Sequence, residues 1–288
     1  MTTPQPSDAA LLEISDLRVA YPGRGLRARP QEILHGVSLT VREGETLGIV
    51  GESGSGKTTI GRAVLGLVKP SGGTVRYRGQ DITHASAGER RALAREIQVV
   101  FQDPYSSLNP SLTIGDILTE PLVVQGVSSA DARSRVSDLL DQVGLPADAS
   151  ERLPREFSGG QRQRVAIARA LAPRPRLIVC DEPVSALDLS NQTRVLELLI
   201  GIQQRSGVAY LFVSHDLAVI RHISHRVGVV HRGGIVETGP AATVTSTPRH
   251  PYTQRLLLAA PVADPVEQRR RRHERRNLAR AEHVEAPT

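Results

Sequence analysis

Residues 46–59 read TLGIVGESGSGKTT, and this stretch is the strongest indication of the fold class. Its second half fits the pattern G-x-x-x-x-G-K-[ST], with Gly51, Gly56, Lys57 and Thr58 in the fixed positions, directly after an apolar run that is typical of a buried strand. Glycines let backbone N–H groups turn toward an anion, and a helix that begins near Lys57 adds its positive dipole end. The stretch therefore predicts a strand, a phosphate-binding loop and a helix, whereas a Gly/Ser loop without a ligand would need none of these flanking signals.

The side chains of this loop have separate predicted roles. Lys57 should reach the β- and γ-phosphate oxygens of a nucleotide, and Thr58 should offer its hydroxyl to Mg²⁺. Lys57 and Lys69 are the only lysines among 36 basic residues, which indicates that a compact ammonium is needed where a planar guanidinium does not fit. The residues that we predict to bind nucleotide here are Gly51, Glu52, Ser53, Gly54, Ser55, Gly56, Lys57, Thr58 and Thr59.

The composition limits the class of protein. A chain of 288 residues suits one large α/β domain with a smaller subdomain and a tail. It contains no run of about 20 mostly apolar residues, so we do not expect it to cross a membrane by itself. Residues 1–10 lack the features of an export signal, which favours the cytoplasm. The single cysteine, Cys180, rules out disulfides within the chain and is expected to be a small buried hydrophobe.

The formal net charge of +6 could indicate contact with nucleic acid or an anionic membrane surface. However, the densest arginine run, Arg269–Arg272, lies in a tail that also carries acidic residues such as Glu267 and Glu274. We interpret this tail, residues 262–288, as a solvated, partly helical or disordered end rather than as a binding patch.

Apolar patterns predict a mostly parallel sheet, a small antiparallel layer and a helical part. Alternating apolar residues at 11–20 and 33–41, with a further strand in 70–79, predict the antiparallel layer. Helical periodicity between about 103 and 170, as in 132–143 and 161–172, predicts a helical insertion. Continuous apolar runs typical of buried parallel strands lie at 97–101, 177–180, 209–213 and 227–230.

Two adjacent carboxylates, Asp181 and Glu182, follow the apolar run 177–180. Open α/β sheets bind ligands at the carboxyl ends of their strands. Neighbouring residues there point in opposite directions, so one carboxylate can hold a Mg²⁺ shell while the other orients and deprotonates an attacking water. We predict Asp181 as the metal-side residue and Glu182 as the catalytic base.

The stretch Ser158–Gln161 opens a helix that should run to Ala172, and S-x-x-Q is a capping-box pattern. Two glycines in a first turn cost roughly 1 kcal/mol each relative to alanine. Either the stretch is only a cap, or a phosphate approaches the backbone there and makes a second anion site.

The order of these motifs resembles that of ATP-binding-cassette (ABC) ATPases over residues 11–245. The resemblance implies an ABC-type core, ATP and Mg²⁺ as cofactors, and a pair of cassettes arranged head to tail. Phe157 stands where that family more often has Leu. Four further residues have plainer interpretations when taken singly: Gln102 as a loop amide, Asp188 as a helix cap, His215 as a core histidine and Tyr21 as a strand residue. The resemblance implies that Ser158, Gly159, Gly160 and Gln161 are the signature that contacts ATP on the opposite chain. It implies that Gln102 is the metal-side and catalytic glutamine, Asp188 the D-loop aspartate, His215 the catalytic switch histidine and Tyr21 the residue that stacks on adenine. Mg²⁺ would be held by Thr58, Gln102 and Asp181, partly through water.

Two further stretches resemble oligopeptide and dipeptide importers, especially the second ATPase subunit. They are residues 101–122 and 247–261, and the second contains the HPYT segment, His250–Thr253. We expect this segment to be a Pro-broken turn before a short apolar helix, Leu256–Ala260, with a role in packing or partner contact. The resulting organisation is an ATPase domain at 11–245, a C-terminal segment at 246–261 and the tail.

This resemblance implies an ATPase that powers peptide uptake from the cytoplasmic face of the membrane. The implied partners are a second ABC ATPase, with a heterodimer favoured, two membrane permease subunits that dock around 103–125, and an extracytoplasmic solute-binding protein. No iron-sulfur cluster is expected, because no cysteine follows Cys180. A soluble cassette acting on ribosomes or nucleic acid would explain the arginine tail, but such proteins usually carry paired cassettes or long coiled coils. A GTPase would need an N-K-x-D motif, which this sequence lacks.

Overall fold

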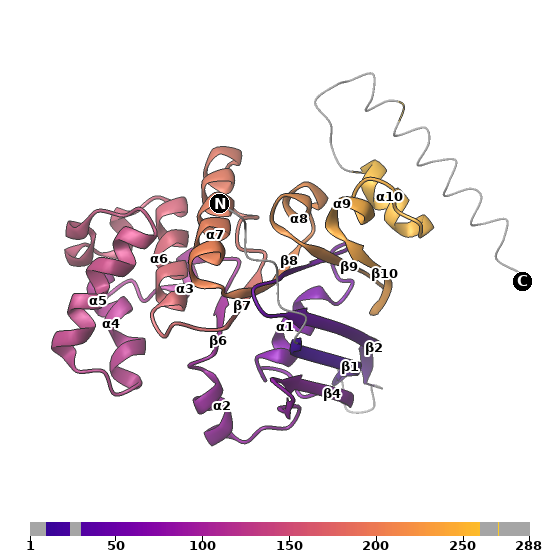
Figure 1. The fold of residues 1–288 in the computed structure, drawn as a ribbon, viewed down its shortest axis with the longest axis horizontal. Helices are drawn as coiled ribbons and strands as arrows, with labels where there is room; N and C mark the ends of the chain where they lie inside the picture. The colour runs from indigo at the N-terminus through magenta and orange to yellow at the C-terminus, as the bar shows by residue number, and fades with distance from the viewer. Residues whose placement is uncertain (1–9, 24–29, 260–269, 271–288) are drawn as a thin grey trace, which may run out of the picture.

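The computed structural model describes residues 10–23, 30–259 and 270, and Figure 1 shows their arrangement. A six-stranded sheet has the order β10-β9-β3-β8-β7-β6, and a four-stranded sheet has the order β2-β1-β4-β5. Helices α4, α5 and α6 form a group on one side, and β1, β2 and β4 lie with α1 on the other. This is the predicted α/β architecture.

The six-stranded sheet is parallel except for the antiparallel pair of β9 and β10 at one edge. Its inner strands are buried on both faces, which is why they read as continuous apolar runs in the sequence. The sequence patterns did not identify β10, whose residues are half-buried or exposed. The strands are β3 (Thr46–Val50), β6 (Ile97–Val100), β7 (Leu177–Asp181), β8 (Ala209–Ser214), β9 (Arg226–His231) and β10 (Gly234–Pro240).

The smaller sheet is antiparallel, as predicted from the alternation of apolar residues. Strand β1 lies between β2 and β4. The strands of this sheet are β1 (Ala10–Tyr21), β2 (Gln31–Arg42), β4 (Gly72–Tyr77) and β5 (Gln80–Asp81).

Two hydrophobic cores lie on opposite faces of the parallel sheet. Along β7, Leu177 and Val179 join the core formed with α1 (Lys57–Val64) and the antiparallel sheet. Ile178 and Cys180 join the core formed with the helices. This period of two follows from the pleat of a strand. The parallel sheet therefore supports the phosphate loop and the helical part together. Cys180 is fully buried, as predicted.

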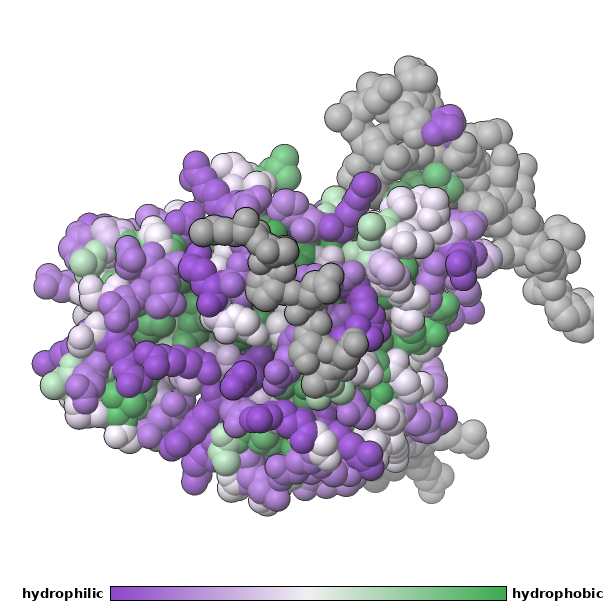
Figure 2. Space-filling view, in the orientation of Figure 1, coloured by the Kyte–Doolittle hydropathy of each residue, from purple (hydrophilic) through white to green (hydrophobic). Residues whose placement is uncertain are grey.

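The helices of the predicted insertion are α3 (Pro104–Ser107), α4 (Ile114–Val124), α5 (Ser129–Gln142) and α6 (Gly159–Leu171), with short 3₁₀ turns at Ala147–Glu151 and Pro154–Glu156. The other helices are α2 (Ala87–Leu93), α7 (Leu189–Ser206), α8 (Leu217–Ile223), α9 (Ala241–Val244) and α10 (Pro251–Ala259). Within the described ranges, no helix is both long enough and apolar enough to cross a membrane. On the face drawn in Figure 2, polar side chains are mixed with separate groups of apolar ones.

The prediction of a turn followed by a helix at the HPYT segment is wrong in one respect. Helix α10 begins at Pro251 rather than at Leu256, so Tyr252 and Thr253 lie in its first turn. Proline is tolerated at the first helical position, because the N–H that it lacks has no partner within the helix there. Ala260 and the tail at 262–288, apart from Arg270, lie outside the described residues.

Candidate functional site

The phosphate loop runs from Gly51 to Gly56, between β3 and α1. A Cβ atom at Gly51 would lie 2.2 Å from the carbonyl oxygen of Val230 in β9, so no larger residue fits. Gly54 and Gly56 have φ angles of +78° and +107°, which residues with a Cβ atom rarely adopt. The loop therefore has the tight turn that its glycines predict.

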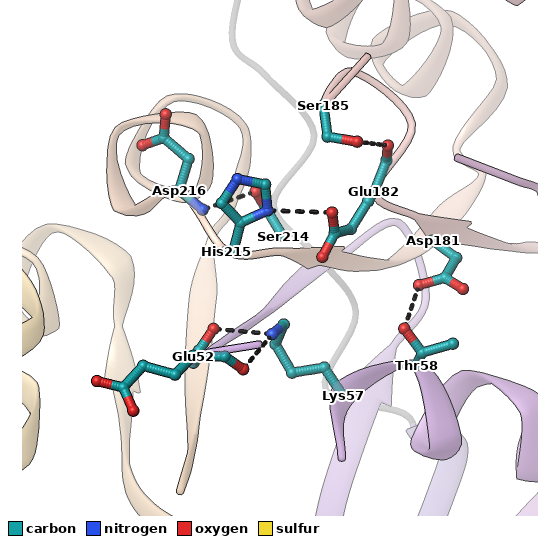
Figure 3. Close-up of polar contacts among 10 residues, drawn as sticks. Glu52, Lys57, Thr58, Asp181, Glu182, Ser185, Ser214, His215 and Asp216 are labelled. Carbon is teal, nitrogen blue, oxygen red and sulfur yellow. Dashed lines mark hydrogen bonds and ion pairs between the residues drawn. The ribbon is translucent and has the colours of Figure 1, made fainter. Parts of the chain in front are cut away.

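Lys57 lies folded against its own loop and is 4% exposed. Its Nζ donates to the carbonyl oxygens of Gly51 and Glu52, each at 2.8 Å (Figure 3). Burial lowers the pKa of Lys57, and the nearby carboxylates of Glu182 and Asp181 act in the opposite direction. A buried ammonium held only by carbonyls would gain strongly from an anion, so this cradle fits a nucleotide phosphate.

A second feature supports that fit. The hydroxyl of Ser55 is buried and has no hydrogen-bond partner among the described residues. Buried polar atoms are almost always paired, so this hydroxyl in the middle of the phosphate loop fits a partner such as a phosphate oxygen.

Thr58 and Asp181, the predicted metal-side residues, contact each other. The Thr58 hydroxyl donates to Oδ1 of Asp181 at 2.9 Å. Burial and the neighbouring Glu182 raise the pKa of Asp181, although the Thr58 hydrogen bond lowers it. The described residues contain no group of three or more His, Cys, Asp or Glu that could hold a metal. Two protein oxygens suit Mg²⁺, which is usually held in ATPase sites by one or two side chains, substrate phosphates and water.

Glu182 has an unusual backbone conformation, with φ at +49°. Its N–H donates to the carbonyl oxygen of Val213 in β8 at 3.0 Å, and its own carbonyl oxygen accepts from the hydroxyl of Ser185 at 3.0 Å. The side chain faces away from Asp181 and toward His215, whose Nδ1 lies 3.0 Å from Oε2 of Glu182 (Figure 3). Strained backbone held by such contacts is typical of functional sites.

His215 follows the end of β8, next to the end of β7, because these two strands are neighbours in the sheet. Its side chain is 55% exposed, whereas that of Glu182 is 17% exposed. The plainer interpretation of His215 as a core histidine is therefore wrong. The pair lies at the carboxyl edge of the sheet, beside the phosphate loop.

Ser158 and Gln161 form a capping box at the start of α6. The Gln161 N–H donates to the Ser158 hydroxyl at 3.3 Å, and the Ser158 N–H donates to Oε1 of Gln161 at 2.9 Å. A Cβ atom at Gly160 would lie 2.8 Å from Oδ1 of Asn191 in α7. Close packing of α6 against α7 thus explains this glycine without a phosphate. Gly159 has no comparably close neighbour.

The remaining predicted site residues lie apart from this cluster. Asp188 caps α7 by accepting from the N–H and the side-chain amide of Asn191. Gln102 is exposed just after β6, and no contact among the described residues links it to Thr58 or Asp181. Tyr21 ends β1, is half-buried and packs against the core of the antiparallel sheet. The roles of these three residues stay predictions.

The sequence interpretation missed one contact at the loop. The hydroxyl of Tyr252, in the HPYT segment, accepts a hydrogen bond from the N–H of Glu52 at 2.9 Å. The sequence motif drew attention to Tyr252, but no local pattern relates residue 252 to residue 52.

Comparisons with known proteins identify the family. A family model described as ABC transporter matches residues 34–185, and one described as the C-terminal region of oligopeptide/dipeptide transporters matches residues 236–285. The glutathione import ATP-binding protein GsiA of Shigella boydii is 51% identical over 267 residues, which make up 91% of this chain and 43% of that protein. The chain thus spans less than half the length of the curated relatives that it matches.

Two solved structures share the fold. The structure of cbiO1 from Clostridium perfringens, part of the ABC transporter complex cbiONQ, aligns with a TM-score of 0.74 and 26% identity, over 83% of this chain and 91% of that one. A dimeric structure of the ATP-binding cassette MJ0796 in a post-hydrolysis state, bound to ADP and Pi, aligns with a TM-score of 0.71 and 29% identity, over 80% and 98% of the two chains. The motifs, the sheet order and these matches lead to one conclusion: the chain belongs to the ABC transporter family.

Proposed function

We propose that this chain binds and hydrolyses ATP to power a multisubunit importer of peptides or related small solutes. The observation that carries the proposal is the cluster at the carboxyl ends of β3, β7 and β8. There Lys57, the pair of Thr58 and Asp181, and the pair of Glu182 and His215 each make contacts of 2.8–3.0 Å. An ammonium, a metal-side oxygen pair and a separate base are the parts that phosphoryl transfer to water requires.

In this mechanism each side chain has one task. Lys57 and the loop N–H groups would bind the phosphates. The Thr58 hydroxyl and the Asp181 carboxylate would hold Mg²⁺, which would supply positive charge to the phosphoryl group. Glu182 orients the attacking water and takes its proton. His215 holds the Glu182 carboxylate and, being exposed, could contact the terminal phosphate. Gln102 would add a further oxygen to the metal side.

Import of peptides is the proposed use of this activity. Support comes from the match of residues 236–285 to the C-terminal region of oligopeptide/dipeptide transporters, and from the name of a relative, a glutathione import protein. Glutathione is itself a small peptide. We assign the ATPase domain to residues 11–245 and the C-terminal segment to residues 246–261.

The proposed membrane partners are two permease subunits, with this chain on the cytoplasmic face. Two adjacent clefts share Ala94 and Gln98: one is lined by the end of α1, α2 and β6, and the other by α2, β6 and α4. Three large apolar side chains on the walls of these clefts are exposed: Leu67 at 61%, Phe101 at 37% and Val124 at 74%. Exposed apolar groups around a cleft are typical of a surface that another protein covers.

A second cassette is the other proposed partner, and a heterodimer is favoured. Leu189 is 78% exposed and directly follows Asp188. Ser158 is also exposed and makes no described contact with its own phosphate loop. Both features fit a face that a second ATPase would cover, so that the signature of one chain closes over ATP held by the other. An extracytoplasmic solute-binding protein would select the cargo.

Affinity purification tests this assembly. The Glu182→Gln variant should retain ATP and remain in the closed complex, so purification from detergent-solubilised cells with ATP and Mg²⁺ should recover a second cassette and permease subunits. Lys57→Ala, which should not bind ATP, is the matched control and should recover less of the second cassette. Recovery of ribosomes or DNA in place of permeases would contradict the importer and leave the ATPase chemistry standing.

A further inference from the structure

One peptide unit of the phosphate loop makes contacts at both of its ends. Its carbonyl oxygen, from Gly51, accepts from Nζ of Lys57 at 2.8 Å. Its N–H, from Glu52, donates to the hydroxyl of Tyr252 at 2.9 Å. A peptide unit is planar, so its carbonyl and N–H groups turn together. The Tyr252 hydroxyl therefore limits the direction in which the Gly51 carbonyl can point.

The direction of that carbonyl matters for Lys57. An ammonium has three N–H donors. Two of them are directed to the carbonyl oxygens of Gly51 and Glu52, and the third has no partner among the described residues. Because the three donors have a fixed tetrahedral arrangement, the positions of the two carbonyls determine where the third can point. Fixing the Gly51–Glu52 peptide thus aims the free donor of Lys57.

Tyr252 is itself held rigidly. Its side chain is buried at 2% exposure, and its ring packs on the ring of His231 with 3.8 Å between the centroids. Its N–H donates to Nδ1 of His250 at 3.1 Å. The preceding backbone is anchored to β10, because the carboxylate of Glu237 accepts from the N–H groups of Arg249 at 2.8 Å and His250 at 3.1 Å.

The chemistry of the hydroxyl suits this position. It accepts the hydrogen bond from Glu52 and keeps its own proton, since burial raises the pKa of Tyr252. A tyrosine has few rotatable bonds, so once its ring is packed its oxygen has little freedom to move. Helix α10 thereby connects the C-terminal segment directly to the loop that cradles phosphate.

We propose that Tyr252 is a positioning residue for nucleotide binding, whose hydroxyl holds the Gly51–Glu52 peptide so that Lys57 is directed toward the phosphates. The proposal rests on the proposed role of Lys57 in binding phosphate. It gives the HPYT segment a task at the nucleotide site in addition to packing.

The test is the Tyr252→Phe variant of the full chain, which removes one oxygen and keeps the ring on His231. We expect the dissociation constant for MgADP, measured by titration calorimetry, to rise about fivefold, the scale of one lost hydrogen bond. We also expect faster amide hydrogen exchange at Glu52, followed by NMR without nucleotide. Tyr77→Phe is the matched control, because the Tyr77 hydroxyl donates to Oε2 of Glu96 at 2.8 Å, in a contact between the end of β4 and the residue before β6.

Three results would overturn the proposal. One is an unchanged affinity for MgADP, which would mean that the hydroxyl does not direct Lys57 toward the phosphates. Another is tighter binding of MgADP, which would mean that the hydroxyl holds Lys57 away from the phosphates. The third is an equal loss of affinity in Tyr77→Phe, which would indicate general destabilisation.

Lys57→Ala, titrated with MgADP in parallel, separates this proposal from the one on which it rests. Normal binding by Lys57→Ala would refute the phosphate-loop assignment, and the role of Tyr252 with it. Lost binding in Lys57→Ala together with normal binding in Tyr252→Phe would refute only the role of Tyr252.

Discussion

At the scale of single residues, the contact between Glu182 and His215 leads to a prediction about hydrolysis. Glu182→Gln should bind ATP and hydrolyse it at least about 100-fold more slowly, because an amide cannot accept the proton of the attacking water. Nucleotide binding should persist, since Lys57 and Thr58 are unchanged. Steady-state phosphate release and nucleotide titration on the purified protein measure the two effects separately.

A matched control exists elsewhere in the chain. Glu197 in α7 also faces a histidine, with its Oε1 3.3 Å from Nε2 of His222, and it lies outside the site. Glu197→Gln should hydrolyse ATP at the rate of the unchanged protein. A Glu182→Gln protein with a rate close to normal would show that another group is the base.

At the scale of secondary-structure elements, the packing of α6 on α7 predicts opposite effects for two helical glycines. In Gly160→Ala the new methyl group would meet Asn191 at 2.8 Å, so the helices must shift and the thermal midpoint should fall. In Gly201→Ala the nearest atom is the flexible end of Arg205, at 3.1 Å. Alanine there should stabilise the protein by about 0.5–1 kcal/mol through helix propensity. Thermal denaturation of both variants tests this, and an equal gain in both would contradict the packing explanation.

The anchoring of α10 by β10 predicts a pH dependence. Burial acts to raise the pKa of Glu237, but the N–H group of Arg249, the Thr253 side chain and the N–H group of His250 together outweigh it and hold the pKa below its usual range. The folded chain therefore favours the ionised form, so this carboxylate contributes stability above the usual pKa of about 4.3 and loses it as the pH falls through the lower, folded value. Glu237→Gln should lower the thermal midpoint at pH 7, and the difference from the unchanged protein should shrink below about pH 4. A difference independent of pH would refute this explanation.

At the scale of the whole molecule, the exposed start of α6 leads to a prediction about pairing of cassettes. Ser158→Arg should leave MgADP binding intact and abolish ATP turnover, because a bulky cation would keep the second cassette from closing over the nucleotide. The substitution also removes a helix cap. Ser128→Arg removes the equivalent cap of α5, where the Ser128 hydroxyl accepts from the N–H of Asp131 at 3.2 Å, and it should retain turnover. Persistent hydrolysis by Ser158→Arg would argue against a site shared between two chains.

Much of the molecule follows from local patterns in the sequence. The glycine spacing at 51–56 dictates a tight loop, and the apolar runs mark the buried strands, because burial on both faces of a sheet excludes polar residues. The capping box at Ser158 and the opposite directions of Asp181 and Glu182 also follow from neighbours along the chain. Strand β10 escaped these patterns, since its half-exposed residues have no continuous apolar run.

The contacts between distant segments were decided only by the tertiary structure. Glu182 meets His215 because β7 and β8 are adjacent in the sheet, and Gly160 is needed because α7 places Asn191 against it. Tyr252 reaches Glu52 only after β9, β10 and α10 have brought the end of the described chain back over the phosphate loop. The loop, the strands and the kinds of chemical group at the site follow from neighbouring residues in the sequence, since they depend on local backbone preference and burial. Which groups touch depends on the order of strands in the sheet, and no local pattern contains that order.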